Sequence, residues 1–203
     1  MKCSGGDYCF ACGRDVSRYG IVNDRCGICV DEKLYFDAIA RAGVYDESLR
    51  KMILAFKFHR RTEFAPHLAA MADAAFQGST FYEETEIFVP VPLHWIRRIF
   101  RGFNQSHIIC KKLNHPSAKI NTDLVRIRNT HRQWKLSNAK RKSNVAGAFA
   151  VRKDHTFTGK SICLIDDITT SWATLNECAK TLKQAGAAKV NALVIAVAAQ
   201  TRK

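Results

Sequence analysis

Residues 161–175, with the sequence SICLIDDITTSWATL, decide the fold that we predict for this chain. Ser161 begins an apolar run that ends at Ile165 and is typical of a buried strand. Two acids, Asp166 and Asp167, follow directly, and a loop rich in hydroxyl groups comes next. Residues 173–186 carry apolar side chains at helical spacing. A strand that ends in carboxylates and turns through hydroxyls into a helix predicts a site for phosphate and ribose.

The chemistry of this turn suits such a ligand. A helix N-terminus offers unpaired N–H groups and partial positive charge to a phosphate. Carboxylates accept hydrogen bonds from ribose hydroxyls or hold Mg²⁺ through water. The alternative is an ordinary strand–loop–helix unit in which Thr170 or Ser171 caps the helix. That alternative leaves two adjacent acids at a buried strand end without compensation for their desolvation, so we favour the ligand site.

Four cysteines near the N-terminus form two Cys-x2-Cys pairs, Cys9 with Cys12 and Cys26 with Cys29. Four thiolates at this spacing predict a structural Zn²⁺ site with no open position for catalysis. So short a segment cannot build a core, and metal binding would supply its folding energy. Free thiols or a redox pair are the alternative. We assign residues 1–36 to a four-cysteine zinc-binding module and residues 37–203 to an α/β domain, with Cys3 as a spare thiol.

The chain has 203 residues and a net charge of +14, and this charge is unevenly distributed. Between residues 87 and 153, fifteen of the 32 Lys and Arg residues accompany one of the 18 acids, so the other 17 basic residues are balanced by 17 acids. So concentrated an excess predicts contact with polyphosphate or nucleic acid, although a solvated basic face is the usual alternative. No apolar run has the length of a membrane span, and no signal peptide is visible. A cytoplasmic protein without membrane insertion is therefore expected.

Two segments of the basic region contain possible ligand contacts. Residues 93–105, LHWIRRIFRGFNQ, place arginines among aromatic side chains and predict an anion-binding loop that leads into a helix at residues 104–113. The alternative is an exposed loop whose aromatic rings lie in the core. Residues 126–149 predict a partly helical flap over the phosphate loop. Strands are expected at residues 38–45, 86–91 and 189–199, and helices at residues 46–59 and 66–76.

Residues 165–175 resemble the phosphoribosyl pyrophosphate (PRPP) signature of type I phosphoribosyltransferases. Trp172 departs from that signature, which has glycine at this position. Over nearly its whole length the chain also resembles the ComF family of bacterial competence proteins. The resemblance lies in the two Cys-x2-Cys pairs and in the segments LRKMILAFKF, PVPLHWIRRIFRGFNQS, RIRNTHRQ, NVAGAF and IDDITTSWATL.

The resemblance implies a type I phosphoribosyltransferase-like parallel sheet flanked by helices, with a small N-terminal zinc module built on four cysteines. It implies a role in natural transformation, in which the protein handles incoming single-stranded DNA, together with the competence DNA-translocating ATPase. The implied PRPP site, with Mg²⁺ accompanying PRPP, comprises Asp166, Asp167, Thr170, Ser171, Trp172, Ala173 and Thr174. The residues expected near pyrophosphate or DNA are Lys57, Arg97, Arg98, Arg101, Asn104 and Gln105.

Three functions remain open at this point. The preferred one is a competence protein that binds single-stranded DNA on its basic region and a PRPP-type ligand at its loop. The second is an active Mg²⁺-dependent phosphoribosyltransferase acting on a base or amine, for which the sequence offers no identifiable general base. The third is a zinc-nucleated scaffold that binds only another protein. For Trp172, the indole either points into the cradle and crowds the phosphate, or points outward, where it stacks on a base or is tolerated without a role.

Overall fold

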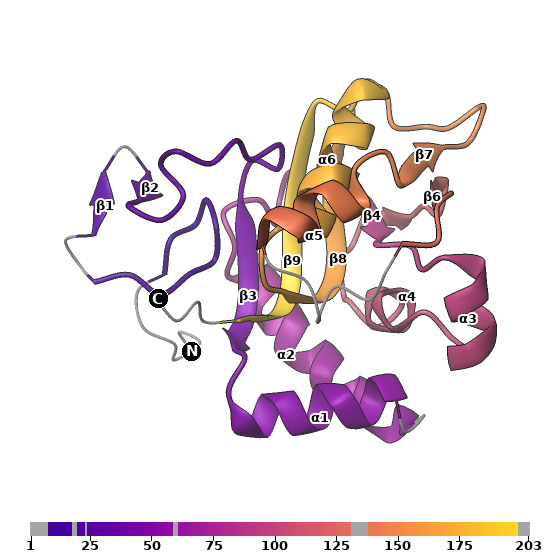
Figure 1. Cartoon of the computed structure of the whole chain (residues 1–203), viewed down its shortest axis with the longest axis horizontal. Coiled ribbons are helices and arrows are strands. Elements are labelled where there is room, and N and C mark those ends of the chain that lie inside the picture. The colour runs from indigo at the N-terminus through magenta and orange to yellow at the C-terminus, as the bar shows by residue number, and fades with distance from the viewer. Residues whose placement is uncertain (1–7, 18–19, 23, 59–60, 131–137, 199–203) are drawn as a thin grey trace.

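The computed structural model describes residues 8–17, 20–22, 24–58, 61–130 and 138–198. Its centre is a parallel sheet of five strands in the order β3-β9-β8-β4-β5, with helices packed on both faces (Figure 1). The strands are β3 (Ile39–Val44), β4 (Ile87–Pro90), β5 (Lys119–Ile120), β8 (Ser161–Thr169) and β9 (Lys189–Val197). This arrangement confirms the predicted α/β class.

The two central strands are apolar because both of their faces are covered. From Val190 to Val197 every residue of β9 is buried, as are the first five residues of β8. Parallel strands covered on both faces read as nearly continuous hydrophobic runs. β8 continues further than the apolar run predicts, because β9 pairs with it as far as Thr169 and Val197. The two acids therefore lie within the strand and not after it, which corrects the prediction.

One face of the sheet is covered by α1 (Glu47–Phe58), α2 (Ala65–Gln77) and α4 (Gln105–Cys110). Helix α1 buries Leu49, Ile53 and Phe56, and the side chain of Asp46 caps it by accepting a 2.8 Å hydrogen bond from the Leu49 amide. A 3-10 turn, η1 (Thr62–Phe64), joins α1 and α2. Both long helices lie where the sequence predicted them.

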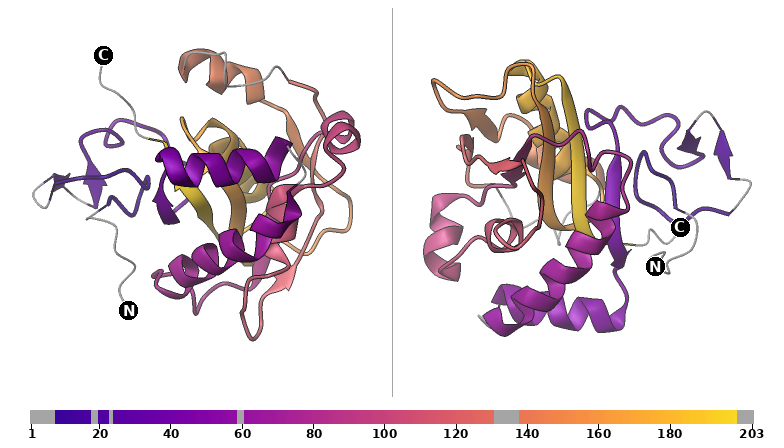
Figure 2. Two further views of the ribbon diagram at one scale, coloured as in Figure 1. Left: turned by 90° about the horizontal axis from the view of Figure 1, so that it is seen from below. Right: turned by 180° about the vertical axis from the view of Figure 1, so that it is seen from behind.

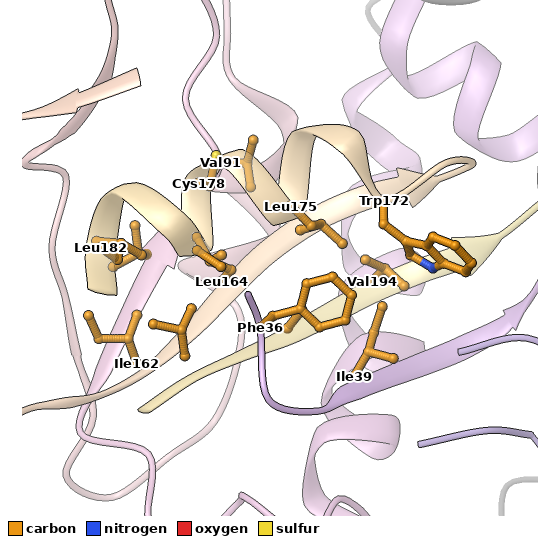
Figure 3. Packing of buried hydrophobic residues seen from close by; sticks show 14 of the residues in the cluster. Phe36, Ile39, Val91, Ile162, Leu164, Trp172, Leu175, Cys178, Leu182 and Val194 are labelled. Atoms are coloured by element: carbon orange, nitrogen blue, oxygen red, sulfur yellow. The ribbon is translucent and has the colours of Figure 1, made fainter. Parts of the chain in front are cut away.

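The other face is covered by α6 (Ala173–Gln184) and by the N-terminal segment that carries the four cysteines, residues 9–36, called the cysteine segment below (Figure 2). The four cysteines belong to the same buried cluster as Phe36, Ile39, Leu164 and Leu175, several of which are drawn in Figure 3. The cysteine segment, with the short strands β1 (Ile21–Val22) and β2 (Arg25–Cys26), thus packs on the edge of the sheet beside β3.

The predicted anion-binding loop is a helix, α3 (Trp95–Arg101). The His94 side chain accepts a hydrogen bond from the Ile96 amide at its start, and Gly102 ends it in the left-handed conformation at φ 85°. A helix forms here because these caps hold it although none of its residues is buried. Trp95 is 63% exposed and Phe100 80% exposed, so these aromatic side chains do not lie in the core.

The basic region ends in an antiparallel pair of strands, β6 (Leu124–Arg126) and β7 (Phe149–Val151). In sequence, α5 (Asn138–Val145) lies between them. The segment Gln133-Trp134-Lys135-Leu136, part of the predicted flap, lies outside the described residues, as does Cys3. Within the described ranges, no helix is long and apolar enough to cross a membrane.

Candidate functional site

The predicted phosphate loop lies between the end of β8 and the start of α6, with Thr170, Ser171 and Trp172 as its turn. The helix that follows has twelve residues, and its N-cap is Trp172, not Thr170 or Ser171. The Trp172 side chain makes no capping hydrogen bond. The N-cap residue therefore leaves the first amides of α6 uncapped, and amides at a helix N-terminus bind anions.

Asp167 is 2% exposed and is compensated by a cation from the opposite layer. Lys57, near the end of α1, places Nζ 2.8 Å from Asp167 Oδ2, and the side chains are 16% and 3% exposed. Oδ1 accepts a 2.7 Å bond from the Ile168 amide. The Lys57 contact does not meet the angles of a hydrogen bond, and no other described group bonds Oδ2, so this oxygen keeps acceptor capacity.

Asp166 is held differently. Its Oδ1 accepts hydrogen bonds from Ser106 Oγ at 3.1 Å and from the Asp167 amide at 2.9 Å. Burial, and then the neighbouring charge of Asp167, raise the pKa of Asp166 to about 7. The carboxyl thus titrates near neutral pH, whereas Asp167 is ion-paired. Ser106 is a buried residue in the first turn of α4, and no sequence pattern singled it out.

The hydroxyl groups of the loop also differ. Arg141 of α5 donates a 3.0 Å hydrogen bond from Nη1 to Thr170 Oγ1. The basic α5 therefore lies against the phosphate loop, as the predicted flap required. The Ser171 hydroxyl is buried and has no hydrogen-bond partner in the described part of the chain. A buried unpartnered hydroxyl costs free energy unless a ligand or water satisfies it.

Arginines of α3 contact neighbouring segments. Arg97 donates to the Thr130 carbonyl oxygen, and Arg101 Nη1 donates to Gln105 Oε1 at 2.6 Å. Arg98 is exposed. Gln105 is only 4% exposed, so its side chain is not part of the surface and instead positions Arg101 from the interior.

The Asn104 side chain makes hydrogen bonds to two segments of backbone. Its Oδ1 accepts a 3.1 Å bond from the Ser106 amide and so caps α4, while Nδ2 donates to the Val91 carbonyl at 3.0 Å. Because Val91 follows β4, this side chain fixes α4 at the end of that strand. The contact of these residues with pyrophosphate or DNA stays a prediction.

The four cysteines form a cluster that can hold a metal ion. Their Sγ atoms all lie within 4.8 Å of one another, and all four residues are buried. Sγ–Sγ distances are 3.7 Å for Cys9–Cys29 and 3.6 Å for Cys12–Cys26. Four thiolates at about 2.3 Å from a tetrahedral ion would lie about 3.8 Å apart, which fits these distances. Burial raises the pKa of Cys29 to about 11, so at neutral pH this thiol loses its proton only when a cation binds the cluster.

The indole of Trp172 packs against this cysteine segment, a contact that the sequence did not predict. Its Nε1 donates a 2.7 Å hydrogen bond to the Cys12 carbonyl, and the ring is 5% exposed. The ring belongs to the buried cluster drawn in Figure 3. The Arg14 guanidinium lies 4.0 Å from the ring centroid and donates a 3.4 Å bond to the Thr170 carbonyl. The ring and the guanidinium thus join the cysteine cluster to the phosphate loop. Arg14 had no sequence signal.

Trp172 adopts the backbone conformation that glycine favours, with φ 56° and ψ −5°. A left-handed residue that is not glycine costs about 1–2 kcal/mol. Burying an aromatic side chain of 150–250 Å² gains roughly 4–6 kcal/mol at 25 cal/mol per Å². Burial therefore outweighs the strain, and the loop keeps the glycine-like turn although it carries the largest side chain.

Known proteins resemble the chain over most of its length. No model of a protein family matches it. Competence protein F of Haemophilus influenzae is 30% identical over 190 residues, covering 90% of this chain and 81% of that protein. The chain belongs to the ComF family of competence proteins. The predicted family is confirmed.

Other ComF relatives carry two kinds of name. DNA utilization protein YhgH of Salmonella typhimurium is 33% identical over 171 residues, covering 81% of this chain and 74% of that protein. Competence protein ComFC of Bacillus subtilis is 27% identical over 186 residues, covering 90% and 74%. Among solved structures, a purine phosphoribosyltransferase from Pyrococcus horikoshii superposes with a TM-score of 0.33 at 12% identity, over 62% of this chain and 70% of that one. That likeness is too weak to support an argument about activity.

The role of Trp172 in this ComF chain is testable by substitution. Trp172→Gly removes both the backbone strain and the buried ring, so we expect a net loss of unfolding free energy of roughly 2–4 kcal/mol. Trp172→Phe keeps a ring and loses the hydrogen bond to Cys12, and we expect a loss of about 1 kcal/mol. Urea unfolding of the metal-loaded proteins measures both.

The matched control is Trp95→Gly, on the 63% exposed tryptophan of α3. Its loss should be close to the helix-propensity cost of glycine, about 1 kcal/mol. If Trp172→Gly is as stable as the wild type, the indole does not hold the loop to the cysteine segment.

Proposed function

We propose that this ComF-family protein binds and handles single-stranded DNA entering the cytoplasm during natural transformation. Two of the relatives are named competence proteins, and a third is named a DNA utilization protein. The observation that carries the proposal is the surface of α3, where aromatic and apolar side chains project into solvent among arginines. The DNA would be delivered by the competence DNA-translocating ATPase, which we propose as a second partner.

The exposed face of α3 suits unpaired bases. Trp95, Ile99 and Phe100 are 63%, 68% and 80% exposed, so much of each side chain is accessible to a ligand. Aromatic side chains bind unstacked bases with about 1–3 kcal/mol per base, and neighbouring arginines bind the phosphates. Duplex DNA hides its bases in the stack, so the combination favours single strands.

The phosphate loop is proposed to bind PRPP or a related ribose phosphate. The N-terminal amides of α6 and the unpartnered Ser171 hydroxyl would receive the 5′-phosphate. Asp166 and Asp167 would accept hydrogen bonds from the ribose hydroxyls. Because Lys57 already pairs with Asp167, Mg²⁺ would enter with the pyrophosphate group of the ligand and be held by these acids through water.

We propose Zn²⁺ as the metal of the cysteine cluster. Four thiolates in tetrahedral spacing suit Zn²⁺ and leave no position for a substrate. The positive charge of Arg14, 4% exposed beside Cys12 and Cys26, would offset part of the negative charge of such a site. The role of the ion is structural.

An active phosphoribosyltransferase is the alternative that one observation favours. A carboxyl with a pKa of about 7, such as that of Asp166, can act as a general base at neutral pH.

The DNA proposal predicts a steep dependence of affinity on salt. A protein that neutralises several phosphates of a single strand loses affinity in proportion to log salt, with a slope of about −0.7 per phosphate. Fluorescence anisotropy with a labelled oligo(dT) at several salt concentrations measures it. We expect Arg98→Gln to lower the affinity and to make the slope less steep by roughly one phosphate.

Arg50→Gln is the matched control, because Arg50 is also exposed but lies on α1 (Figure 1). It should leave the slope unchanged. Absence of binding at low salt, or a flat response, would refute the DNA proposal and leave the protein scaffold as the better function.

The zinc proposal predicts one tightly bound Zn²⁺ per chain, measured by atomic emission on purified protein. Chelation should unfold the cysteine segment and lower the melting temperature, because the metal supplies folding energy. Cys12→Ser should have the same effect, whereas Cys110→Ser, on α4 outside the cluster, should retain the metal. Purified protein without metal that melts at the same temperature with and without chelator would contradict this.

The transferase alternative is tested by release of pyrophosphate from PRPP with Mg²⁺ and a panel of bases. We expect PRPP binding, measured by calorimetry, to weaken by about tenfold or more in Asp167→Asn, because a charged acceptor is lost. We expect no turnover with any base. Turnover in the wild type that disappears in Asp167→Asn would establish the enzyme and overturn our preference.

A further inference from the structure

A cleft of about 440 Å³ lies beside the phosphate loop but shares none of its residues. Its lining residues come from the end of β4, from α3 and the start of α4, and from β6 and the residue after β7. Its volume is within the range of about 300–1,000 Å³ typical of small-ligand sites. The cleft shares Trp95 and Arg98 with the exposed surface of α3, and most of its other lining residues lie outside that helix.

The floor of the cleft is apolar and aromatic. Pro92, Leu93 and Val125 line it, together with the rings of Trp95 and Phe103. Phe103 is held in place by stacking on Phe56 of α1, with ring centroids 5.3 Å apart. Trp95 is 63% exposed, so part of its ring is accessible to a ligand. A flat ring entering the cleft would meet aromatic surface on the way in.

Three arginines, Arg98, Arg126 and Arg152, line the same cleft, and no carboxylate lines it. None of the ion pairs within the described ranges involves any of these three residues. Asp166 acts on Arg126 from outside the lining, but the three cations gathered at this concave surface outnumber it and create a positive potential that attracts an anion. The cleft is therefore suited to a ligand with negative charge.

Arg126 is the most constrained of the three. Its guanidinium lies 5.2 Å from the centroid of Phe149, and one terminal nitrogen donates to Thr130 Oγ1. Its Nε is buried and has no hydrogen-bond partner among the described residues. Burial lowers the pKa of Arg126, as expected for a cation with incomplete compensation. A donor fixed in this way loses little conformational freedom when it binds an anion.

We propose that this cleft binds one nucleotide unit of single-stranded DNA, with the phosphate against Arg98, Arg126 and Arg152 and the base against Trp95 and Phe103. The proposal deepens the DNA-binding function and rests on it. A duplex is excluded from this mode because its bases are stacked and cannot enter. The exposed face of α3, which carries Phe100, would bind neighbouring nucleotides of the same strand.

The experiment compares two probes on the full chain: thymidine 5′-monophosphate, measured by calorimetry, and a labelled oligo(dT) of about 15 nucleotides, measured by anisotropy. Arg152→Gln removes a cleft arginine, and Lys153→Gln removes the same charge from the adjacent exposed position, which does not line the cleft. Thr122→Phe fills the cleft from an exposed lining position without changing any charge.

We expect Arg152→Gln to weaken the monophosphate by about fivefold and Lys153→Gln by less than about twofold. Thr122→Phe should weaken it by about tenfold and leave the salt slope of oligo(dT) unchanged, because the cations remain. Unaltered melting temperatures show that the variants are folded.

Two results overturn the cleft while the DNA function stands. In the first result, Arg152→Gln and Lys153→Gln lower the affinity for oligo(dT) equally, and Thr122→Phe has no effect on it. The surface then acts only through general charge. Inorganic phosphate that competes as well as the monophosphate means that no base is bound. If wild-type protein binds no oligo(dT) at low salt, the proposed function fails and the cleft proposal fails with it.

Discussion

The parallel ladder between β8 and β9 is the constraint on which the rest of this structure depends. Because it continues to Thr169, it draws Asp166 and Asp167 into the sheet, where carboxylates are costly unless compensated. Lys57 from α1 and Ser106 from α4 supply the compensation, and both helices lie on the face that α1, α2 and α4 cover. The strand pairing thus places two acids within the sheet, and side chains of α1 and α4 interact with their carboxylates.

The phosphate loop is then fixed from the other side by the cysteine segment. Cys12 receives the hydrogen bond of Trp172, and the side chain of Asn176 adds two more ties: Tyr35 donates from its amide to Asn176 Oδ1 at 2.5 Å, and Asn176 Nδ2 donates to the Lys33 carbonyl at 2.9 Å. A metal ion that folds the cysteine segment would therefore also hold the start of α6. A tryptophan in place of glycine extends this contact without changing the turn.

The charge of the basic region is divided between two surroundings. Arg141 of α5 contacts the phosphate loop, while Arg98 and Arg152 lie around the cleft at the end of β4. A ribose phosphate and a DNA strand would thus meet different cations of one basic region. Proximity of the two sites at the carboxyl ends of the strands follows from the geometry of open parallel sheets.

The sequence alone determined the parallel α/β class, the two long helices, the phosphate-loop position and the cysteine cluster, because periodicity, cysteine spacing and a strand–acid–hydroxyl–helix order are local signals. It misassigned α3 as a loop, since His94 and Gly102 cap a helix with no buried face. The partners Arg14 and Ser106 come from elements distant in sequence, and no local pattern marks them, whereas Arg141 belongs to the predicted basic flap. Tertiary packing alone decided where the Trp172 indole lies, because only the folded sheet brings Cys12 within hydrogen-bond distance of a residue 160 positions away.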